Sequence, residues 1–311
     1  MEATLTTSKP HANGPVQDAP VQGAPVREAR VSRSLKWRAL SLLMRTAGRL
    51  SDGIALGYAR GFDSGDMLDY IYEDRARGKL LVGRLIDRIY LNAIGWRGIR
   101  NRRDLLKRLV RDEIARNRLA GRDTAIVDIA SGPGRYLIEV LRDAGYGTAA
   151  PGCAVSALCR DVSATGIRRG RQIAQEFRVT NIRHERGDAF DPASIAVIEP
   201  RPNVVIVSGL YELFLDREMI ARSLSALYDI AEPGAAIIVT TQVSHPQLDM
   251  IANVLPNRDG LPWIMECRPA GLTEQWLGAA GFQVSGSLTE PLGLFAVTVA
   301  RKPGLFSFPK V

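Results

Sequence analysis

An acidic residue and two glycines stand together where an aliphatic segment ends and a helical pattern begins. Residues 125–127 are Ala, Ile and Val, Asp128 follows, and residues 131–134 read Ser-Gly-Pro-Gly. From residue 136 the order Tyr-Leu-Ile-Glu-Val-Leu has the pattern of a helix. A buried strand that enters a helix through such a loop lets a ligand approach bare backbone at the helix N-terminus. We therefore predict a ligand site around residues 128–134.

The position of the acid distinguishes two kinds of site. Nicotinamide and flavin folds use the spacing G-x-G-x-x-G, with an acid further along the chain. Here Leu137 stands where the third glycine is expected, and Asp128 precedes the glycines. The pattern D-x-A-S-G-x-G instead resembles the first motif of the class I S-adenosylmethionine-dependent methyltransferases, with Ala130 in place of the first glycine. The resemblance implies an α/β fold with a Rossmann-like, doubly wound seven-stranded sheet, and S-adenosyl-L-methionine as the cofactor.

Later segments repeat the order that this family shows. Residues 153–161 read as a second strand that ends in Asp161, where the family holds the ribose hydroxyls with a carboxylate. Residues 187–190, Gly-Asp-Ala-Phe, resemble the segment that faces the adenine, and residues 203–208 read as a fourth strand. Residues 282–288 and 294–302 read as the antiparallel terminal hairpin. The cofactor-binding residues implied by the resemblance are Asp128, Ala130, Ser131, Gly132, Gly134, Asp161, Val162, Asp188, Ala189, Phe190 and Ser208.

Each acid also has a purely structural interpretation. Asp128 could be a surface acid at a strand end, Asp161 could cap the helix that follows, and Asp188 could stabilise a turn. Catalytic residues are less well marked, because a sulfonium methyl is already activated and mainly needs an acceptor held in line with it. The weak candidates for a general base are Tyr211, Glu212 and His245, and none of them stands in a diagnostic motif.

The sequence disfavours several acceptors. It has no N/D-P-P-Y/F segment, the family signature for the exocyclic amines of bases or for protein glutamine, and no Pro-Cys segment for cytosine C5. We therefore expect a small-molecule or lipid acceptor that is methylated by in-line displacement. Two alternatives stay open: an RNA methyltransferase that uses a basic helical arm, and a binding scaffold without turnover. The RNA methyltransferase predicts an RNA affinity that falls as salt rises, and the scaffold predicts no methyl transfer.

Composition agrees with a cytoplasmic enzyme. No apolar run approaches the ~20 residues that cross a bilayer, and the N-terminus has no basic-then-apolar signal. The three cysteines include no C-x-x-C pair and the three histidines are scattered, so we expect no metal site. We expect residues 1–31 to be a disordered tail, residues 32–122 a basic helical cap or lid, and residues 123–311 the methyltransferase domain.

Positive charge gathers before this domain. Residues 27–122 contain 23 Lys and Arg against 11 Asp and Glu, whereas the residues after 122 carry a slight negative excess. Residues 34–50 form an amphipathic helical pattern with Leu35, Ala39 and Leu43 on one face, and residues 104–119 form another, with Asp104 as its expected N-cap. These faces could pack on the core, or they could bind an acidic membrane surface or an anionic substrate. Nucleic acid is the least favoured partner.

The helical region carries a second, narrower resemblance. Residues 57–72 and 85–100, together with the later motifs, resemble a bacterial domain family described as methyltransferases and often fused behind an α/β-hydrolase. No G-x-S-x-G nucleophile motif of a hydrolase occurs in this chain. Tyr58, Tyr70, Tyr72 and Tyr90 would suit a lid over a sulfonium cation, although packing between helices is an equally simple role.

Overall fold

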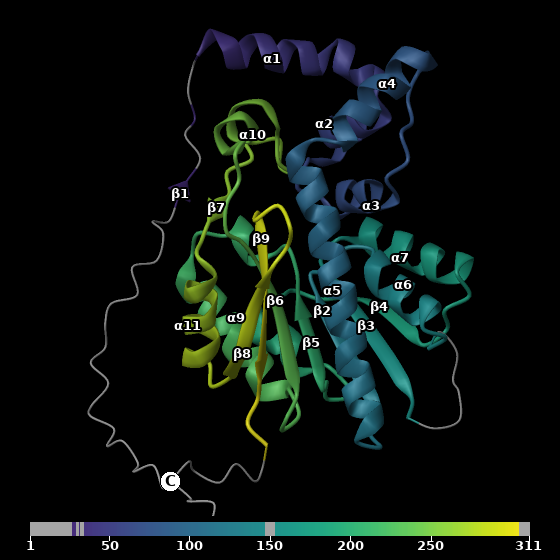
Figure 1. The fold of residues 1–311 in the computed structure, drawn as a ribbon, viewed down its shortest axis with the longest axis vertical. Helices are drawn as coiled ribbons and strands as arrows, with labels where there is room; N and C mark the ends of the chain where they lie inside the picture. Colours follow the sequence, from purple (N-terminus) through teal and green to yellow (C-terminus); the bar gives the residue numbers. More distant parts are fainter. Residues whose placement is uncertain (1–26, 29–30, 32–33, 147–152, 305–311) are drawn as a thin grey trace, which may run out of the picture.

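A seven-stranded sheet forms the centre of the protein (Figure 1). The computed structural model describes residues 27–28, 31, 34–146 and 153–304. The strand order is β4-β3-β2-β5-β6-β9-β8; the first five are parallel, and β9 is antiparallel to both of its neighbours. The strands are β2 (Thr124–Ile129), β3 (Val155–Asp161), β4 (Ile182–Arg186), β5 (Val204–Val207), β6 (Ala236–Gln242), β8 (Gln283–Thr289) and β9 (Phe295–Arg301). The predicted fold class and its antiparallel terminal hairpin are confirmed.

Helices cover both faces of the sheet because its central strands are apolar on both sides. On one face, α8, α9 and α11 pack over Val127 and Ile129; on the other, α5, α6 and α7 pack over Ile126. These helices are α5 (Ile94–Leu119), α6 (Arg135–Asp143), α7 (Ala164–Glu176), α8 (Pro192–Ala196), α9 (Arg217–Ile230) and α11 (Ala270–Ala279). The carboxyl ends of β2, β3, β4 and β5 therefore share one sheet edge, where a doubly wound sheet binds its ligands.

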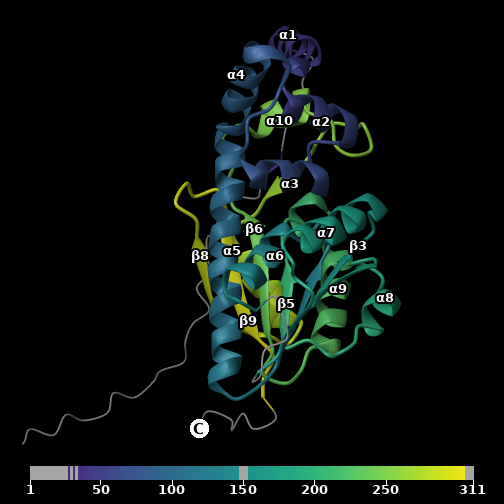
Figure 2. The same ribbon diagram turned by 90° about the vertical axis from the view of Figure 1, so that its right-hand side faces the viewer.

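A helical layer lies beyond that edge (Figure 2). It contains α1 (Leu35–Arg45), η1 (Ala47–Leu50), α2 (Asp52–Arg60), α3 (Gly65–Glu73), α4 (Leu80–Leu91) and α10 (Leu248–Val254). The apolar contacts on the two faces of the sheet form two cores. Apolar side chains from these helices, from the first turns of α5 and from residues 263–267 form a third core. The 26-residue α5 runs from this layer down along the sheet, and thus joins the two parts. The predicted N-terminal helical cap is present, and residues 243–269 add to it. No helix in the described part of the chain is long and apolar enough to cross a bilayer.

The sequence-based boundaries differ from the structure in some places. Asp104 does not cap a helix, because α5 begins at Ile94 and continues through it; Asp104 instead lies exposed and pairs with Arg103. Residues 34–50 form α1 and then the short η1 rather than one helix. Arg27–Glu28, which we assigned to the tail, form strand β1 and pair with β7 (Glu266–Cys267). Residues 1–26, most of the predicted tail, lie outside the described residues.

Candidate functional site

A cavity of ≈ 450 Å³ lies at the carboxyl edge of the parallel strands, beneath α3. We call it the sheet-edge cavity. Its lining brings together residues from the loops after β2, β3, β4 and β5, as the strand order requires. The predicted cofactor-binding residues that line it are Ala130, Ser131, Gly132, Gly134, Asp161, Val162, Asp188, Ala189, Phe190 and Ser208. The volume is within the usual range for a small-molecule site.

The loop after β2 turns sharply enough to bring bare backbone to this cavity. Ala130, Gly132 and Gly134 all have left-handed backbone angles, with φ of 55°, 55° and 67°. A side chain at Gly134 would place Cβ 2.5 Å from the sulfur of Cys159. Glycine is therefore required at Gly134 for packing as well as for conformation. The turn directs the N-terminus of α6 towards the cavity, which favours a ligand rich in acceptor atoms.

Asp161 fastens the loops after β2 and β3 to each other. One of its carboxylate oxygens accepts a hydrogen bond from the Gly132 N–H (2.7 Å) and the other accepts one from the Ser163 N–H (2.7 Å). Helix capping is carried out by the Ser163 hydroxyl, which accepts the Gly166 N–H. Asp161 is thus not the cap of α7. Each of its oxygens keeps a second lone pair for a hydroxyl donor in the cavity.

The loop after β4 supplies the opposite wall. Asp188 is exposed, and its carboxylate accepts the N–H of Phe190 (2.9 Å), so this acid does stabilise a local turn while it lines the cavity. The Phe190 ring packs edge-on against Phe214, with ring centroids 4.6 Å apart. A flat heterocycle with an amino group would fit such a pair, because its ring could pack on the phenyl ring and its amino group could donate to the carboxylate.

Asp128 does not reach the cavity. It is buried, and its side chain lies on the face of the sheet that α6 covers, beside the Tyr136 hydroxyl. Burial raises the pKa of Asp128 to about 8, against the opposing effect of Tyr136. The surface interpretation of this acid is therefore wrong. Its effect on a ligand would be indirect, through the loop that it precedes.

The helical layer closes over the glycine loop. The Cα of Gly132 lies near Gly65 at the start of α3, and an added Cβ on either residue would come within 3.2 Å of the other's backbone. Asp63, two residues before Gly65, pairs with Arg258 from the loop after α10 (3.0 Å) and accepts the Arg258 N–H (2.6 Å). These contacts form the roof of the sheet-edge cavity.

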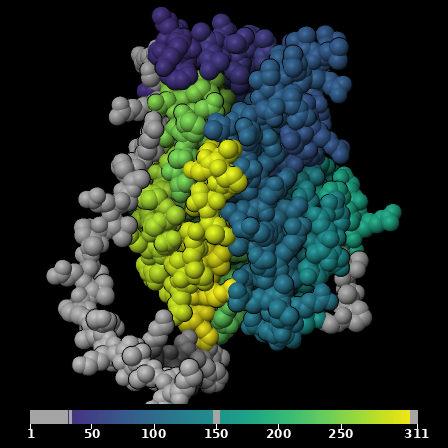
Figure 3. All heavy atoms as spheres, viewed as in Figure 1, coloured from purple at the N-terminus to yellow at the C-terminus, as the bar shows by residue number. Residues whose placement is uncertain are grey.

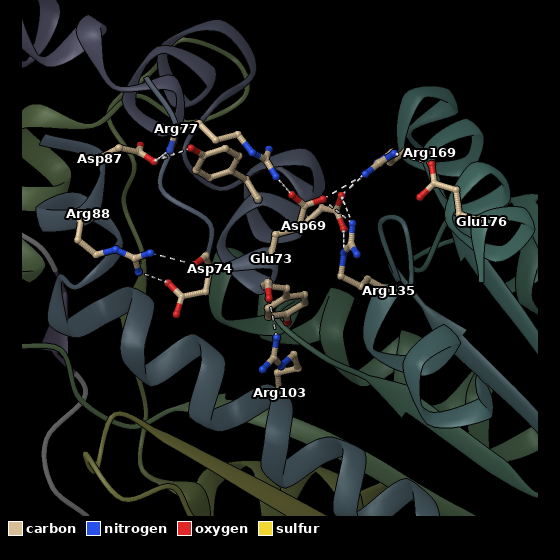
Figure 4. Close-up of polar contacts among 12 residues, drawn as sticks. Asp69, Glu73, Asp74, Arg77, Asp87, Arg88, Arg103, Arg135, Arg169 and Glu176 are labelled. Carbon is tan, nitrogen blue, oxygen red and sulfur yellow. Dashed lines mark hydrogen bonds and ion pairs between the residues drawn. The ribbon is translucent and has the colours of Figure 1, made fainter. Parts of the chain in front are cut away.

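An ion-pair network fastens α3 to the sheet domain (Figure 4). Arg135, the first residue of α6, pairs with Asp69 and reaches Glu73 (2.8 Å). Arg169 of α7 pairs with the same two acids, each at 3.2 Å. Asp69 and Arg135 are buried, so this contact is screened little by solvent. The ligand loop, α6 and the roof are therefore mechanically connected.

A second cavity of ≈ 410 Å³ lies inside the helical layer, next to the first. We call it the apolar cavity, because aromatic and aliphatic side chains from α1, α4, α5, α10 and residues 255–265 form most of its lining. Trp96 and Trp263 stack at 6.2 Å between ring centroids on one side of it. The residues that line both cavities are Asp63, Leu68, Gly209 and Leu213. The two cavities therefore adjoin each other at the loop after β5.

A buried ion pair stands at this junction. Arg102 of α5 pairs with Glu212 at 3.2 Å, and Arg102 lies so near Gly209 that a Cβ there would be 3.2 Å from its guanidinium. Within the described part of the chain, Arg102 Nε and Glu212 Oε2 have no hydrogen-bond partner. Burial raises the pKa of Glu212, while Arg102 counteracts this. The pair thus offers one free donor and one free acceptor beside the apolar cavity.

The three catalytic candidates have different positions. Glu212 and His245 line the apolar cavity. Tyr211 is buried in the sheet core, where its hydroxyl bonds to Ser223 (2.9 Å), and it belongs to neither lining. His245 Nδ1 accepts the Gln247 N–H, so the ring proton lies on Nε2, and burial lowers the pKa of His245 to about 4. His245 therefore presents a neutral N–H donor.

The four lid tyrosines also separate. Tyr72 lines the sheet-edge cavity and Tyr90 lines the apolar cavity. Tyr70 donates a hydrogen bond to buried Asp87 (2.6 Å), and Tyr58 packs edge-on against Phe62, so both have packing roles. Sequence reasoning missed Arg102 and the wall formed by residues 248–265. Within residues 248–265, Met250, Trp263 and Met265 were the available signal.

A family model described as "Putative methyltransferase" matches residues 3–302. The chain belongs to this methyltransferase family. The prediction of the family from the strand-end motifs is confirmed. The chain is also 40% identical over 269 residues to the uncharacterized protein YnbC of Escherichia coli K12, covering 86% of this chain and 45% of YnbC. It therefore spans less than half the length of that relative.

Solved structures agree with the fold. A possible exported protein from Bordetella parapertussis superposes with a TM-score of 0.60 (16% identity; 88% of this chain and 100% of that one). The methyltransferase SibL gives 0.52 (14%; 88% and 71%). Magnesium protoporphyrin IX methyltransferase from Synechocystis PCC 6803, with bound SAH, gives 0.51 (14%; 78% and 98%). The fold is therefore that of the class I S-adenosylmethionine-dependent methyltransferases.

Proposed function

We propose that this methyltransferase takes its methyl group from S-adenosylmethionine in the sheet-edge cavity and transfers it to an apolar small molecule or lipid in the apolar cavity. The observation that carries the proposal is that Gly209 and Leu213 line both cavities. A donor and an acceptor held on either side of this junction would be in contact there.

The residues present fit the donor. The left-handed turn at Gly132 and Gly134 presents backbone to the cavity at the N-terminus of a helix. Asp161 would hold the ribose hydroxyls through its remaining lone pairs, and Asp188 with Phe190 would hold the adenine. The donor, when bound, supplies a methyl group on a sulfonium that needs no further activation.

The chain's own residues then position the acceptor and handle its proton. Apolar walls exclude water, which strengthens polar interactions at the junction. Glu212 is the candidate base, because burial raises its pKa and Oε2 is free to accept a proton from a hydroxyl or amine. Arg102 keeps that carboxylate oriented and faces Gly209. His245 can donate a hydrogen bond from Nε2 to the acceptor's polar group.

The test is methyl transfer from labelled donor. Purified protein is incubated with methyl-labelled S-adenosylmethionine and a total cell extract, which is then partitioned between organic solvent and water. We expect label in the organic phase, as an apolar acceptor requires. Label only in RNA or protein would refute the apolar acceptor, and no label with intact donor binding would indicate a scaffold without turnover.

A further inference from the structure

Two helices of the cap expose a large set of apolar side chains. On α1 and α4, eight residues are between 57% and 82% exposed. They are Leu35, Leu42, Leu43, Leu80, Leu81, Val82, Leu85 and Ile89. We call this set the α1–α4 surface. Both helices lie at the same end of the molecule (Figures 1 and 3). Exposed apolar side chains that gather at one end of a protein mark an interaction site.

Helix α1 has two apolar faces. Trp37, Leu40 and Met44 point inward and pack against the third core. Leu35 and Leu42 lie on the opposite side of the helix, two turns apart, and remain exposed. The face that we predicted from residues 35, 39 and 43 is thus the outer one, and it does not pack on the core. A helix needs only one apolar face to dock on its own domain, so the outer face must serve another contact.

The charge around this surface is positive. Lys36 flanks the outer leucines of α1 on one side, and Arg38 and Arg45 flank them on the other. Residues 34–50 contain no Asp or Glu. On α4, Arg84 is exposed beside the leucines, and the acid Asp87 is fully buried. An apolar strip with flanking cations is the pattern of a helix that lies in the surface of an anionic membrane.

The same surface borders the apolar cavity. Ile89 is 66% exposed and also lines that cavity. Leu40 and Met44, on the inner face of α1, line it as well. The lining of the cavity therefore extends from the inner face of α1 to an exposed residue of α4.

We propose that the α1–α4 surface docks on a membrane that contains anionic lipid, and that the acceptor enters the apolar cavity from the bilayer between α1 and α4. Docking itself follows from the exposed leucines and the cations. Entry of the acceptor rests in addition on the proposed function. The charge complementarity favours a lipid surface over a second copy of this chain, which would bring two positive surfaces together.

The experiment is co-sedimentation of the full chain with vesicles. One set is phosphatidylcholine alone, and in the other about a third of the lipid is phosphatidylglycerol. The test variant is Leu81→Gln with Leu85→Gln, because neither residue lines a cavity. The matched control is Leu119→Gln with Val197→Gln, two exposed apolar residues on α5 and after α8. Calorimetry with S-adenosylhomocysteine accompanies each sample.

We expect the wild type to bind the anionic vesicles more tightly than the neutral ones, with a loss of affinity as salt rises. The Leu81/Leu85 variant should bind at least about tenfold more weakly, while the control stays within about twofold. No vesicle binding by the wild type, or equal binding by the Leu81/Leu85 variant, would overturn the proposal. The proposal would also be overturned if light scattering showed that the wild type is a dimer and the Leu81/Leu85 variant a monomer. Normal vesicle binding without any affinity for S-adenosylhomocysteine would contradict only the proposed function.

Discussion

The two adjoining cavities are built in opposite ways. The sheet-edge cavity is formed mainly by short loops at strand ends, with backbone N–H groups and carboxylates held by hydrogen bonds and ion pairs. The apolar cavity is formed by side chains from helices far apart in the sequence, with polar groups confined to a few buried positions such as Arg102 and Glu212. Under the proposed function, donor recognition would depend on backbone shape and acceptor recognition on replaceable side chains. Substitutions should therefore separate the two.

The largest effect is expected on the donor side. Asp161→Ala removes the carboxylate that holds Gly132 and Ser163, together with the proposed ribose contact. Affinity for S-adenosylhomocysteine should fall by about a hundredfold or more, because both the loop backbone and the ribose lose a charged hydrogen-bond partner. Calorimetry measures it, with circular dichroism to check the fold. Affinity within about threefold of the wild type would show that the donor binds elsewhere.

The next effect should fall on the acceptor side alone. Met250→Trp fills part of the apolar cavity without touching the lining of the sheet-edge cavity. Transfer of label to the organic phase should drop at least about tenfold, while the donor Kd stays within about twofold. Met250→Leu, which keeps the volume, is the control and should retain transfer. If both variants transfer equally well, the acceptor does not occupy this cavity.

A smaller effect should distinguish the buried network from surface pairs. Asp69→Ala leaves buried Arg135 with Glu73 as its remaining acid, so we expect a loss of about 2 kcal/mol in the free energy of unfolding. Asp104→Ala breaks the exposed Arg103 pair and should cost less than about 0.5 kcal/mol. Urea unfolding measures both. Equal losses would mean that the network does not fasten the cap.

The smallest effect, taken per pH unit, is a pH dependence of stability. Burial raises the pKa of Asp128 from its ordinary value of 3.8 to about 8, so between these pH values the folded protein keeps a proton that the unfolded chain has released. Stability should therefore fall as pH rises through this window, by up to about 1.4 kcal/mol per unit. Asp128→Asn should remove that part of the slope, which urea unfolding at several pH values between 5 and 8 can measure. Parallel slopes in the two proteins would contradict the assignment.

The sequence predicted the lining of the sheet-edge cavity far better than that of the apolar cavity. The residues at strand ends follow one another within short motifs, and the register of a parallel sheet brings strand ends together whatever covers them. Ten of the eleven predicted residues line the cavity, and only Asp128 lies behind it. The apolar cavity could not be predicted in this way. The ring centroids of Trp96 and Trp263 are 6.2 Å apart, but the five parallel strands lie between these residues in the sequence.

The predictions for α1 and for Asp104 were limited in the same way, because a local pattern does not show what a residue contacts. The apolar pattern at residues 35, 39 and 43 identified a real face of α1, but amphipathicity does not say whether a face meets the core or something outside the chain. Asp104 is of a residue type that often caps helices. The helix nevertheless begins at Ile94, where no side chain caps its first turn.

The most direct test of the two-cavity arrangement is a crystal structure with S-adenosylhomocysteine bound. We predict that its ribose hydroxyls contact Asp161, that its adenine lies beside Asp188 and Phe190, and that its sulfur points past Gly209 into the apolar cavity. A nucleoside bound outside the sheet-edge cavity, or a sulfur directed away from Gly209, would contradict the account.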